Sequence, residues 1–172
     1  KLFADDLKLS SQIRTKHDNI AAQISLDRLE QWCRDWQLII NISNCRILHL
    51  GTNNPYKLYF INGSQIETSQ VVADLGVGVH IDADLHYDAH INKIVGKTYS
   101  RLGVLFKGFA SRDAQVLKTA YVSYVRPLLE YASSVWSPHL LKHINAVEKV
   151  QKHFAKRIKS LSDLSYPERL AS

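Results

Sequence analysis

The chain of 172 residues contains no methionine and only two cysteines, and these scarcities limit what kind of protein it is. Cys33 and Cys45 cannot build a disulfide framework, and no Cys-x-x-Cys pair offers a zinc site, so we expect reduced thiols in an intracellular protein. No apolar run approaches the ~20 residues of a membrane-spanning helix, and no signal peptide is visible. Because methionine is missing even at the start, we expect the chain to be part of a longer protein.

Charge is divided unevenly along the chain, whose net charge is +6. Residues 1–85 carry 8 Lys or Arg against 10 Asp or Glu, whereas residues 86–172 carry 14 against 6. A basic half favours a polyanionic partner, most simply nucleic acid. A domain that is basic without such a partner explains the same numbers equally well, so charge alone leaves both interpretations open.

Residue patterns predict a mixed N-terminal half. Residues 1–10 indicate a strand, a tight turn at two adjacent aspartates, and a second strand. Asn62-Gly63 lies between two β-rich runs and predicts a hairpin with a type I′ turn. Residues 45–51 and 71–82 are further β segments. These elements give residues 1–85 an expected mixture of strands around a single helix.

That helix is expected over residues 16–37, where apolar side chains recur at three- and four-residue steps. The apolar stripe consists of Ala22, Leu26, Leu29, Cys33 and Trp36. Trp32, Trp36 and Trp136 are accordingly expected in the core rather than as stacking platforms for bases.

In the C-terminal half, residues 86–172, the spacing of apolar residues predicts only helices. They are expected over residues 88–108, from a cap at Ser111 and Asp113 to Tyr124, and over residues 141–159 as the last helix. Pro127 either kinks the chain or begins a new helix. The fold class is therefore α+β, with residues 1–85 and 86–172 as the two domains.

Three clusters of residues contain side chains that could bind a metal ion or an anionic partner. Asp5 and Asp6 are adjacent carboxylates, which bind hard ions such as Mg²⁺, although such a pair is more often a solvated turn. A second cluster matches no zinc spacing, which favours a structural or solvated role; it comprises His80, Asp82, Asp84, His86, Asp88 and His90. The third follows one side of the last predicted helix and comprises Lys149, Lys152, Lys156, Arg157 and Lys159. A solvated helix face and a helix that follows a phosphate backbone both show such a row.

Several segments together resemble one protein family. FADD, at Phe3–Asp6, resembles the catalytic hairpin of reverse transcriptases in the form used by LINE-type, non-LTR retrotransposons. ISLDRLEQWCRDWQLIINISNCRILHLG resembles the helix and strand that follow this hairpin, and VVADLGVGVHIDADLHYDAHI resembles the primer-grip region. YVSYVRPLLEYASSVWSPHL and VEKVQKHFAKRI resemble the helical thumb, and LSYPERL fits its end. The order of these segments is similar to the jockey-like branch over essentially the whole chain.

The resemblance implies a partial polymerase palm over residues 1–85, with an antiparallel sheet, a packed helix and a hairpin, followed by an all-helical thumb over residues 86–172. Asp5 and Asp6 would be the catalytic and metal-binding carboxylates for two Mg²⁺ ions, and Leu75 and Gly76 would lie at the primer grip. The lysine and arginine row would contact an RNA template and DNA primer duplex. The parent enzyme would add dNTPs to a primer 3′ end by two-metal phosphoryl transfer, in the nucleus and cytoplasm and without a membrane partner.

Two departures from the family pattern bear on activity. The family's other metal-binding aspartate, on an earlier palm strand, has no counterpart in this chain. Asn44 stands where the family usually has a lysine that helps to protonate the leaving pyrophosphate, and an amide cannot act as that acid. We therefore expect the chain to be inactive in isolation. The alternatives are a non-catalytic, nucleic-acid-binding remnant of a retrotransposon and a relic without function.

Overall fold

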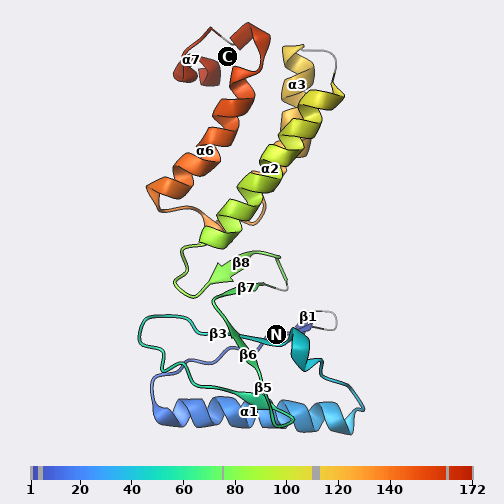
Figure 1. The fold of residues 1–172 in the computed structure, drawn as a ribbon, viewed down its shortest axis with the longest axis vertical. Coiled ribbons are helices and arrows are strands. Elements are labelled where there is room, and N and C mark those ends of the chain that lie inside the picture. The colour runs from blue at the N-terminus through green and yellow to red at the C-terminus, as the bar shows by residue number, and fades with distance from the viewer. Residues whose placement is uncertain (1, 4–5, 75, 110–112, 162, 172) are drawn as a thin grey trace. The chain divides into compact units, whose positions relative to one another are not determined.

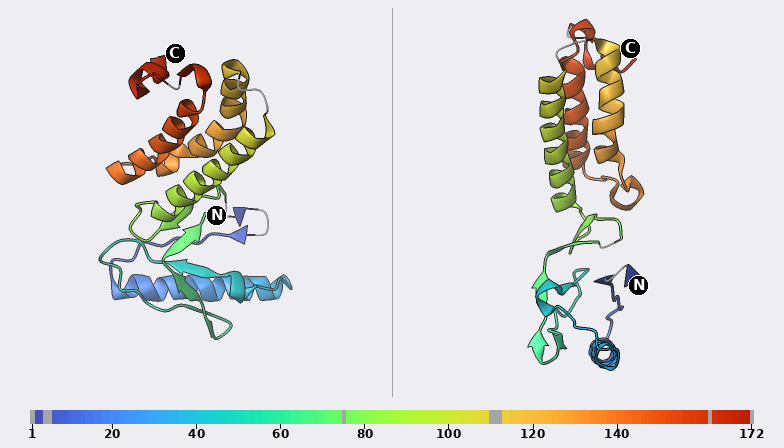
Figure 2. Two further views of the ribbon diagram at one scale, coloured as in Figure 1. Left: turned by 45° about the horizontal axis from the view of Figure 1, so that its top comes forward. Right: turned by 90° about the vertical axis from the view of Figure 1, so that its right-hand side faces the viewer.

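The computed structural model describes the chain except residues 1, 4–5, 75, 110–112, 162 and 172, and it leaves the side chains of residues 2, 3, 159, 170 and 171 undescribed. Two compact units are present, Lys1–Leu85 and His86–Ser172 (Figure 1). The first unit mixes strands with a helix, and the described part of the second contains helices (Figure 2).

The first unit is built on the helix α1 (Lys16–Asp35), which agrees with the helix predicted for residues 16–37. A capping box begins it: the backbone N–H of Asp18 donates to the Thr15 hydroxyl, and the backbone N–H of Thr15 donates to the Asp18 carboxylate at 2.7 Å. Ala22 on α1 packs with Tyr59, Ile61 and Ile66 in a small buried cluster.

The tryptophan prediction for this helix is wrong. Trp32 is 48% exposed and Trp36 is 68% exposed, whereas Trp136 in the second unit is 2% exposed, as expected. Trp36 lies one residue beyond the end of α1, as its C-cap. Trp32 directly precedes the buried Cys33, and neighbouring residues on a helix point about 100° apart, so burial of Cys33 turns Trp32 toward solvent.

The strands of the first unit are short and pair two by two. β1 (Leu2–Phe3) pairs with β2 (Asp6–Leu7), β3 (Arg46–Leu48) with β6 (Glu67–Ser69), β4 (Phe60–Ile61) with β5 (Ser64–Gln65), and β7 (Val71–Ala73) with β8 (His80–Asp82). Three of these ladders are antiparallel, whereas β3 and β6 run parallel. The single antiparallel sheet that was expected is therefore replaced, in the described residues, by four two-stranded sheets.

Two local predictions for the first unit are confirmed. Asn62 and Gly63 both have positive φ, 51° and 70°, as a type I′ turn between β4 and β5 requires. The segment 71–82 forms the β7–β8 hairpin, in which Gly78 has a φ of 65° and donates its N–H to the carbonyl of Asp74. The short 3₁₀ helix η1 (Ile42–Asn44) leads into β3.

The second unit begins with the long helix α2 (Asp88–Gly108), which packs against α6 (Leu141–Lys156) and against α4 (Arg126–Glu130). Between them come α3 (Ala114–Ala120), the π-helix η2 (Tyr121–Val125) and α5 (Ser133–Trp136). The Asp113 carboxylate accepts the N–H of Val116 and so caps α3 as predicted, whereas Ser111 lies outside the described residues. Pro127 occupies the first turn of α4, one of the two predicted outcomes.

A continuous apolar core holds these helices together. Phe154 of α6 stacks on Tyr121 of η2 with ring centroids 4.1 Å apart, and it also faces Phe106 of α2 at 6.1 Å. Leu117 of α3 and Val150 of α6 are completely buried in the same cluster. This core fixes which side of α6 faces the solvent.

The end of the chain differs from the prediction of one last helix over residues 141–159. α6 ends at Lys156, and a 3₁₀ turn, η3 (Lys159–Leu161), leads to a further helix, α7 (Tyr166–Ala171). The backbone N–H and the hydroxyl of Ser165 both donate to the Glu168 carboxylate, at 2.7 and 2.6 Å, at the start of α7. No helix within the described ranges is long and apolar enough to cross a lipid bilayer.

Candidate nucleic-acid interface

The predicted metal-binding pair is described only in part. Asp5 lies outside the described residues, and Asp6 lies in strand β2, where it pairs with Phe3 and is exposed. Asp6 is the first residue of β2, and its pairing with Phe3 places it at the end of the predicted turn. Within the described residues, no three His, Cys, Asp or Glu side chains lie close enough to hold a metal ion. Two-ion sites use several carboxylates, so a site at Asp6 would need Asp5 and at least one further carboxylate that the described residues do not bring to it.

The predicted primer-grip segment forms a tight loop around one aspartate. Leu75 lies outside the described residues, while the N–H groups of Gly76 and Val77 donate to the Asp74 carboxylate at 3.1 and 3.2 Å. Lys8 also donates to this carboxylate, and this bond is the main reason that the pKa of Asp74 lies below its ordinary value. Lys8 follows Asp6 by two residues, so the ion pair joins the two predicted site segments of the first unit.

Asp88, from the predicted histidine–aspartate cluster, has a structural role. It is the first residue of α2, and its carboxylate binds the Lys142 ammonium at 2.6 Å and the buried His143 ring, both in the first turn of α6. The hydrogen bond from Lys142, followed by that from His143, lowers the pKa of Asp88. This carboxylate therefore ties the beginning of α6 to the beginning of α2.

Helix α6 has two different sides, as the lysine spacing predicted. Val150 and Phe154 face the core, whereas Lys149, Lys152 and Lys156 are exposed. These three lysines are separated by three and four residues, which places them along one side of the helix. They form one exposed row of positive charge along α6.

The other two predicted cations do not extend this row in the described structure. Arg157 is the C-cap of α6, and its guanidinium carbon lies 5.0 Å from the centroid of the Phe106 ring, so it covers the core. Lys159 belongs to the 3₁₀ turn η3, and its side chain is not described.

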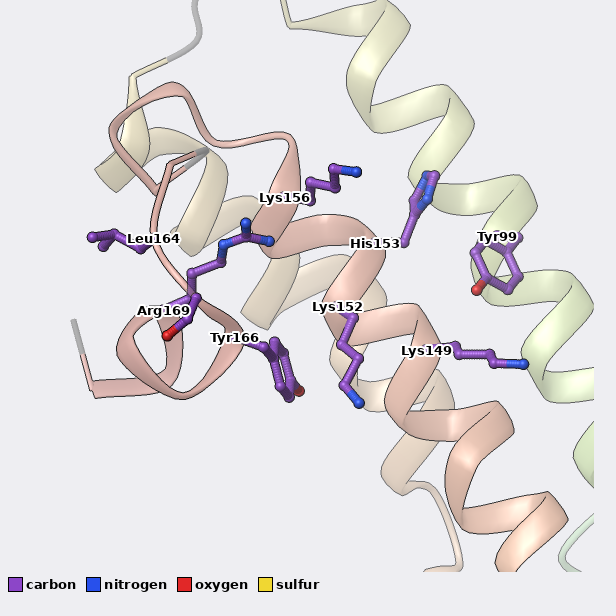
Figure 3. Close-up of a pocket in the computed structure, with 9 residues that line it drawn as sticks. Tyr99, Lys149, Lys152, His153, Lys156, Leu164, Tyr166 and Arg169 are labelled. Atoms are coloured by element: carbon purple, nitrogen blue, oxygen red, sulfur yellow. The ribbon is translucent and has the colours of Figure 1, made fainter.

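The three lysines line a pocket of about 460 Å³ between α6 and the C-terminal segment (Figure 3). Its other walls come from Tyr99 on α2, His153 on α6, and Leu164, Ser165, Tyr166 and Arg169 near the chain end. Figure 3 shows Arg169 on the side of the pocket opposite the lysines, with its guanidinium directed toward α6. We call this cavity, with its nine lining residues, the α6–α7 pocket.

The electrostatics of the α6–α7 pocket favour an anion. Its lining includes three lysines and one arginine and no carboxylate. Burial, followed by the charge of Arg157, lowers the pKa of His153, so this ring is neutral at pH 7 and leaves the positive charge to the lysines and Arg169. An anion at this pocket would replace part of its hydration shell with ammonium donors.

Two tyrosines give the pocket aromatic walls of fixed orientation. The Tyr166 hydroxyl donates to the Glu148 carboxylate, and the Lys152 ammonium lies 4.6 Å from the centroid of the Tyr166 ring. Burial, together with the bond to Glu148, raises the pKa of Tyr166, so it stays protonated. The Tyr99 ring meets His153 edge to face at 5.5 Å.

Sequence reasoning did not identify Tyr99, Tyr166 or Arg169 as site residues. A signal for the C-terminal helix is nevertheless present, because Ser165 and Glu168 have the Ser-x-x-Glu spacing of a capping box and Pro167 stands near the helix start. This signal would have predicted α7, and with it Arg169 on a helix. No local sequence pattern predicts that α7 packs against α6.

Comparison with known proteins gave two similar sequences. The chain is 25% identical over 162 residues to a probable RNA-directed DNA polymerase from transposon X-element of Drosophila melanogaster, over 91% of this chain and 18% of that protein. It is 26% identical over 96 residues to an uncharacterized Caenorhabditis elegans protein, over 54% of this chain and 48% of that protein. The chain thus spans less than half of either relative. No protein-family model matches the chain, and no solved structure matches it. The first similarity supports a relationship to the reverse transcriptases of retrotransposons.

Proposed function

We propose that this chain is the C-terminal palm and thumb part of the RNA-directed DNA polymerase of a jockey-like, non-LTR retrotransposon, and that its own task is to hold the template–primer duplex. The observation that carries the proposal is the side of α6 with Lys149, Lys152 and Lys156, which the core residues Val150 and Phe154 turn toward solvent. The similarity to a transposon polymerase over 91% of the chain supports it.

The physical basis of duplex binding is the release of counterions from the phosphate backbone. Each cation that neutralises a phosphate lowers the slope of log K against log salt concentration by about 0.9 for B-form DNA. Lys149 and Lys156 are seven residues apart, which corresponds to about 10 Å along the helix axis. A row of this length meets about three successive phosphates of one strand, at about 3.4 Å of duplex axis each.

In the parent enzyme, the first unit would contribute Asp5 and Asp6 to a site for two Mg²⁺ ions, which would stabilise the attacking and leaving oxygens when bound. The Lys8–Asp74 ion pair would hold the segment after Asp6 against the loop that contains Gly76. The remaining carboxylate would come from a part of the parent enzyme outside this chain. We therefore propose that the chain alone does not extend a primer.

Duplex binding is tested by fluorescence anisotropy with a labelled RNA–DNA hybrid at 50 to 200 mM salt. The variant with Lys149→Gln, Lys152→Gln and Lys156→Gln is expected to make the salt slope less steep by about 2.7, from three lost contacts at about 0.9 each. Between 50 and 200 mM salt, the affinity of this variant is therefore expected to fall by a factor about 40-fold smaller than that of the unaltered chain.

A control variant removes the same charge from exposed lysines outside the α6–α7 pocket, namely Lys93→Gln, Lys107→Gln and Lys118→Gln. The control is expected to retain most of the salt slope. An equal decrease in both variants would show that binding follows net charge alone, and the α6 row would then have no special part.

A non-catalytic remnant remains a second candidate, favoured by the exposed position of Asp6 within strand β2. Replacing Asp5 and Asp6 by Asn is expected to leave duplex binding unchanged under both candidates. Primer extension by the unaltered chain on an RNA template with Mg²⁺ would contradict the proposed inactivity. Restoration of activity by adding the upstream part of the parent enzyme, lost again with the Asn variants, would reject the remnant.

A further inference from the structure

We propose that the α6–α7 pocket binds a single unpaired nucleotide, with the phosphate on Lys152, Lys156 and Arg169 and the base against Tyr99. The inference rests on the proposed nucleic-acid function and deepens it, because it names the form of strand that enters the pocket.

The first argument is the shape of the charge distribution. A duplex presents its phosphates along a line, which suits the row on α6. The cations around the α6–α7 pocket instead come from two sides, because Arg169 on α7 is directed toward α6 from across the cavity (Figure 3). Cations on two sides of one pocket differ from the single line of charge that a continuous backbone would meet.

The second argument is the size of the cavity. Its volume of about 460 Å³ lies within the ~300–1,000 Å³ that is typical of pockets for small ligands. The pocket is shallow and open to solvent, so a single nucleotide that has left its stack would lie in it with one side exposed. Recognition of unpaired bases by splaying them into protein pockets is a general mode for single strands.

The third argument is the combination of cations with aromatic rings. An inorganic anion or an acidic peptide would use only the lysines and Arg169. The pocket also presents Tyr99, which is 37% exposed, and Leu164 at its edge. Every base has a π-face that stacks on such a ring, so cations beside exposed aromatic rings match a nucleotide.

The pocket is also held in place before any ligand arrives. Glu148 on α6 accepts the Tyr166 hydroxyl, and Glu168 accepts two hydrogen bonds from Ser165 at the start of α7. These bonds fix the C-terminal segment beside α6. A binding site that is already ordered loses less entropy when its ligand binds.

The test uses the complete chain, a labelled single-stranded oligonucleotide, and three unlabelled competitors: AMP, inorganic phosphate and an acidic peptide. We expect AMP to displace the oligonucleotide at a concentration at least tenfold lower than phosphate or the peptide requires. Equal competition by phosphate would show that the base contributes nothing, and stronger competition by the peptide would assign the pocket to another ligand; either result overturns the inference.

Two variants connect binding to the pocket. Tyr99→Ala is expected to weaken oligonucleotide binding at least fivefold, and Arg169→Gln at least fivefold. The matched controls are Tyr124→Ala, at a tyrosine that is 64% exposed outside the pocket, and Arg28→Gln on α1, both expected to change affinity less than twofold. A thermal melt of each variant shows whether it is folded.

The outcome separates this inference from the proposed function. If the triple lysine variant loses duplex binding while Tyr99→Ala and Arg169→Gln leave oligonucleotide binding intact, duplex binding stands and the nucleotide pocket is refuted. If AMP binding depends on Tyr99 and Arg169 while the triple lysine variant leaves duplex binding unchanged, nucleotide binding in the pocket is supported and the duplex proposal is refuted.

Discussion

Replacing Phe154 by alanine tests whether the core of the second unit determines the position of the lysine row. Phe154 is 5% exposed and stacks on Tyr121 at 4.1 Å. A phenylalanine buries about 150–250 Å², and about 25 cal/mol per Å² gives an upper estimate of ~4–6 kcal/mol. Measured Phe→Ala changes in protein cores cost about 3–5 kcal/mol, because part of the side chain is retained and the cavity relaxes.

This loss is large compared with the stability of the unit itself. At roughly 0.05–0.15 kcal/mol per residue, residues 86–172 are stabilised by about 4–13 kcal/mol. Phe154→Ala therefore removes about a quarter or more of that stability and brings a weakly stable unit close to unfolding. Phe154 packs the inner side of α6 against the core. When this packing is lost, we expect α6 to become less ordered, and the lysines on its outer side no longer to form a fixed row.

The measurement is hydrogen exchange of the complete chain, followed by mass spectrometry of peptides from α2 and α6. Phe154→Ala is expected to lower the opening free energy of both helices by about 3–5 kcal/mol, and Phe154→Leu by less than half as much. Val104→Ala is the control, because Val104 is 70% exposed on α2 and its loss is expected to change stability by less than about 0.5 kcal/mol.

A decrease below about 1 kcal/mol for Phe154→Ala would refute the reasoning, since such a value is typical of a surface position. A decrease confined to α6, without effect on α2, would show that the two helices do not share one cooperative core.

Three further predictions concern the caps, the tryptophans and the ion pair. Thr15→Ala is expected to cost about 1 kcal/mol through loss of its cap to the Asp18 N–H, and hydrogen exchange in the first turn of α1 measures this. Trp36→Ala is expected to change stability by less than about 0.5 kcal/mol, against about 3–5 kcal/mol for Trp136→Ala in urea unfolding. The lowered pKa of Asp88 means that its contribution to stability is present at neutral pH and declines as pH falls through the folded-state pKa. Asp88→Asn is therefore expected to destabilise the chain at pH 7 and to have a progressively smaller effect as the pH is lowered, as urea unfolding over a pH series would show; an effect that does not change with pH would contradict this.

Local patterns predicted those elements whose information lies in neighbouring residues. The type I′ turn at Asn62-Gly63 depends on two residues that tolerate positive φ, and the cap at Asp113 depends on one carboxylate before a helix. The lysine row on α6 follows from spacing alone, because helix geometry converts steps of three and four residues into one side.

The same patterns could not predict which side of a helix is buried or which strands pair with each other. Helix α1 has apolar residues on more than one side, and only packing against Tyr59, Ile61 and Ile66 determines that Ala22 is buried. Trp32 is left exposed as a result, against the prediction. Strands of two or three residues, as in β3 and β6, carry too few alternating positions to indicate which strand they will pair with, or in which direction.

The sequence by itself determined the basic second half, the helices that carry its cations, and the family resemblance of its motifs, because charge, periodicity and motif order are properties of the chain. Only the tertiary structure decided that Lys152 and Lys156 line one pocket with Arg169 and two tyrosines. The physical reason is that α7 is held against α6 by contacts such as Tyr166 to Glu148, across 18 residues of chain. Such a contact depends on how the intervening segment turns, which no local spacing of residues specifies.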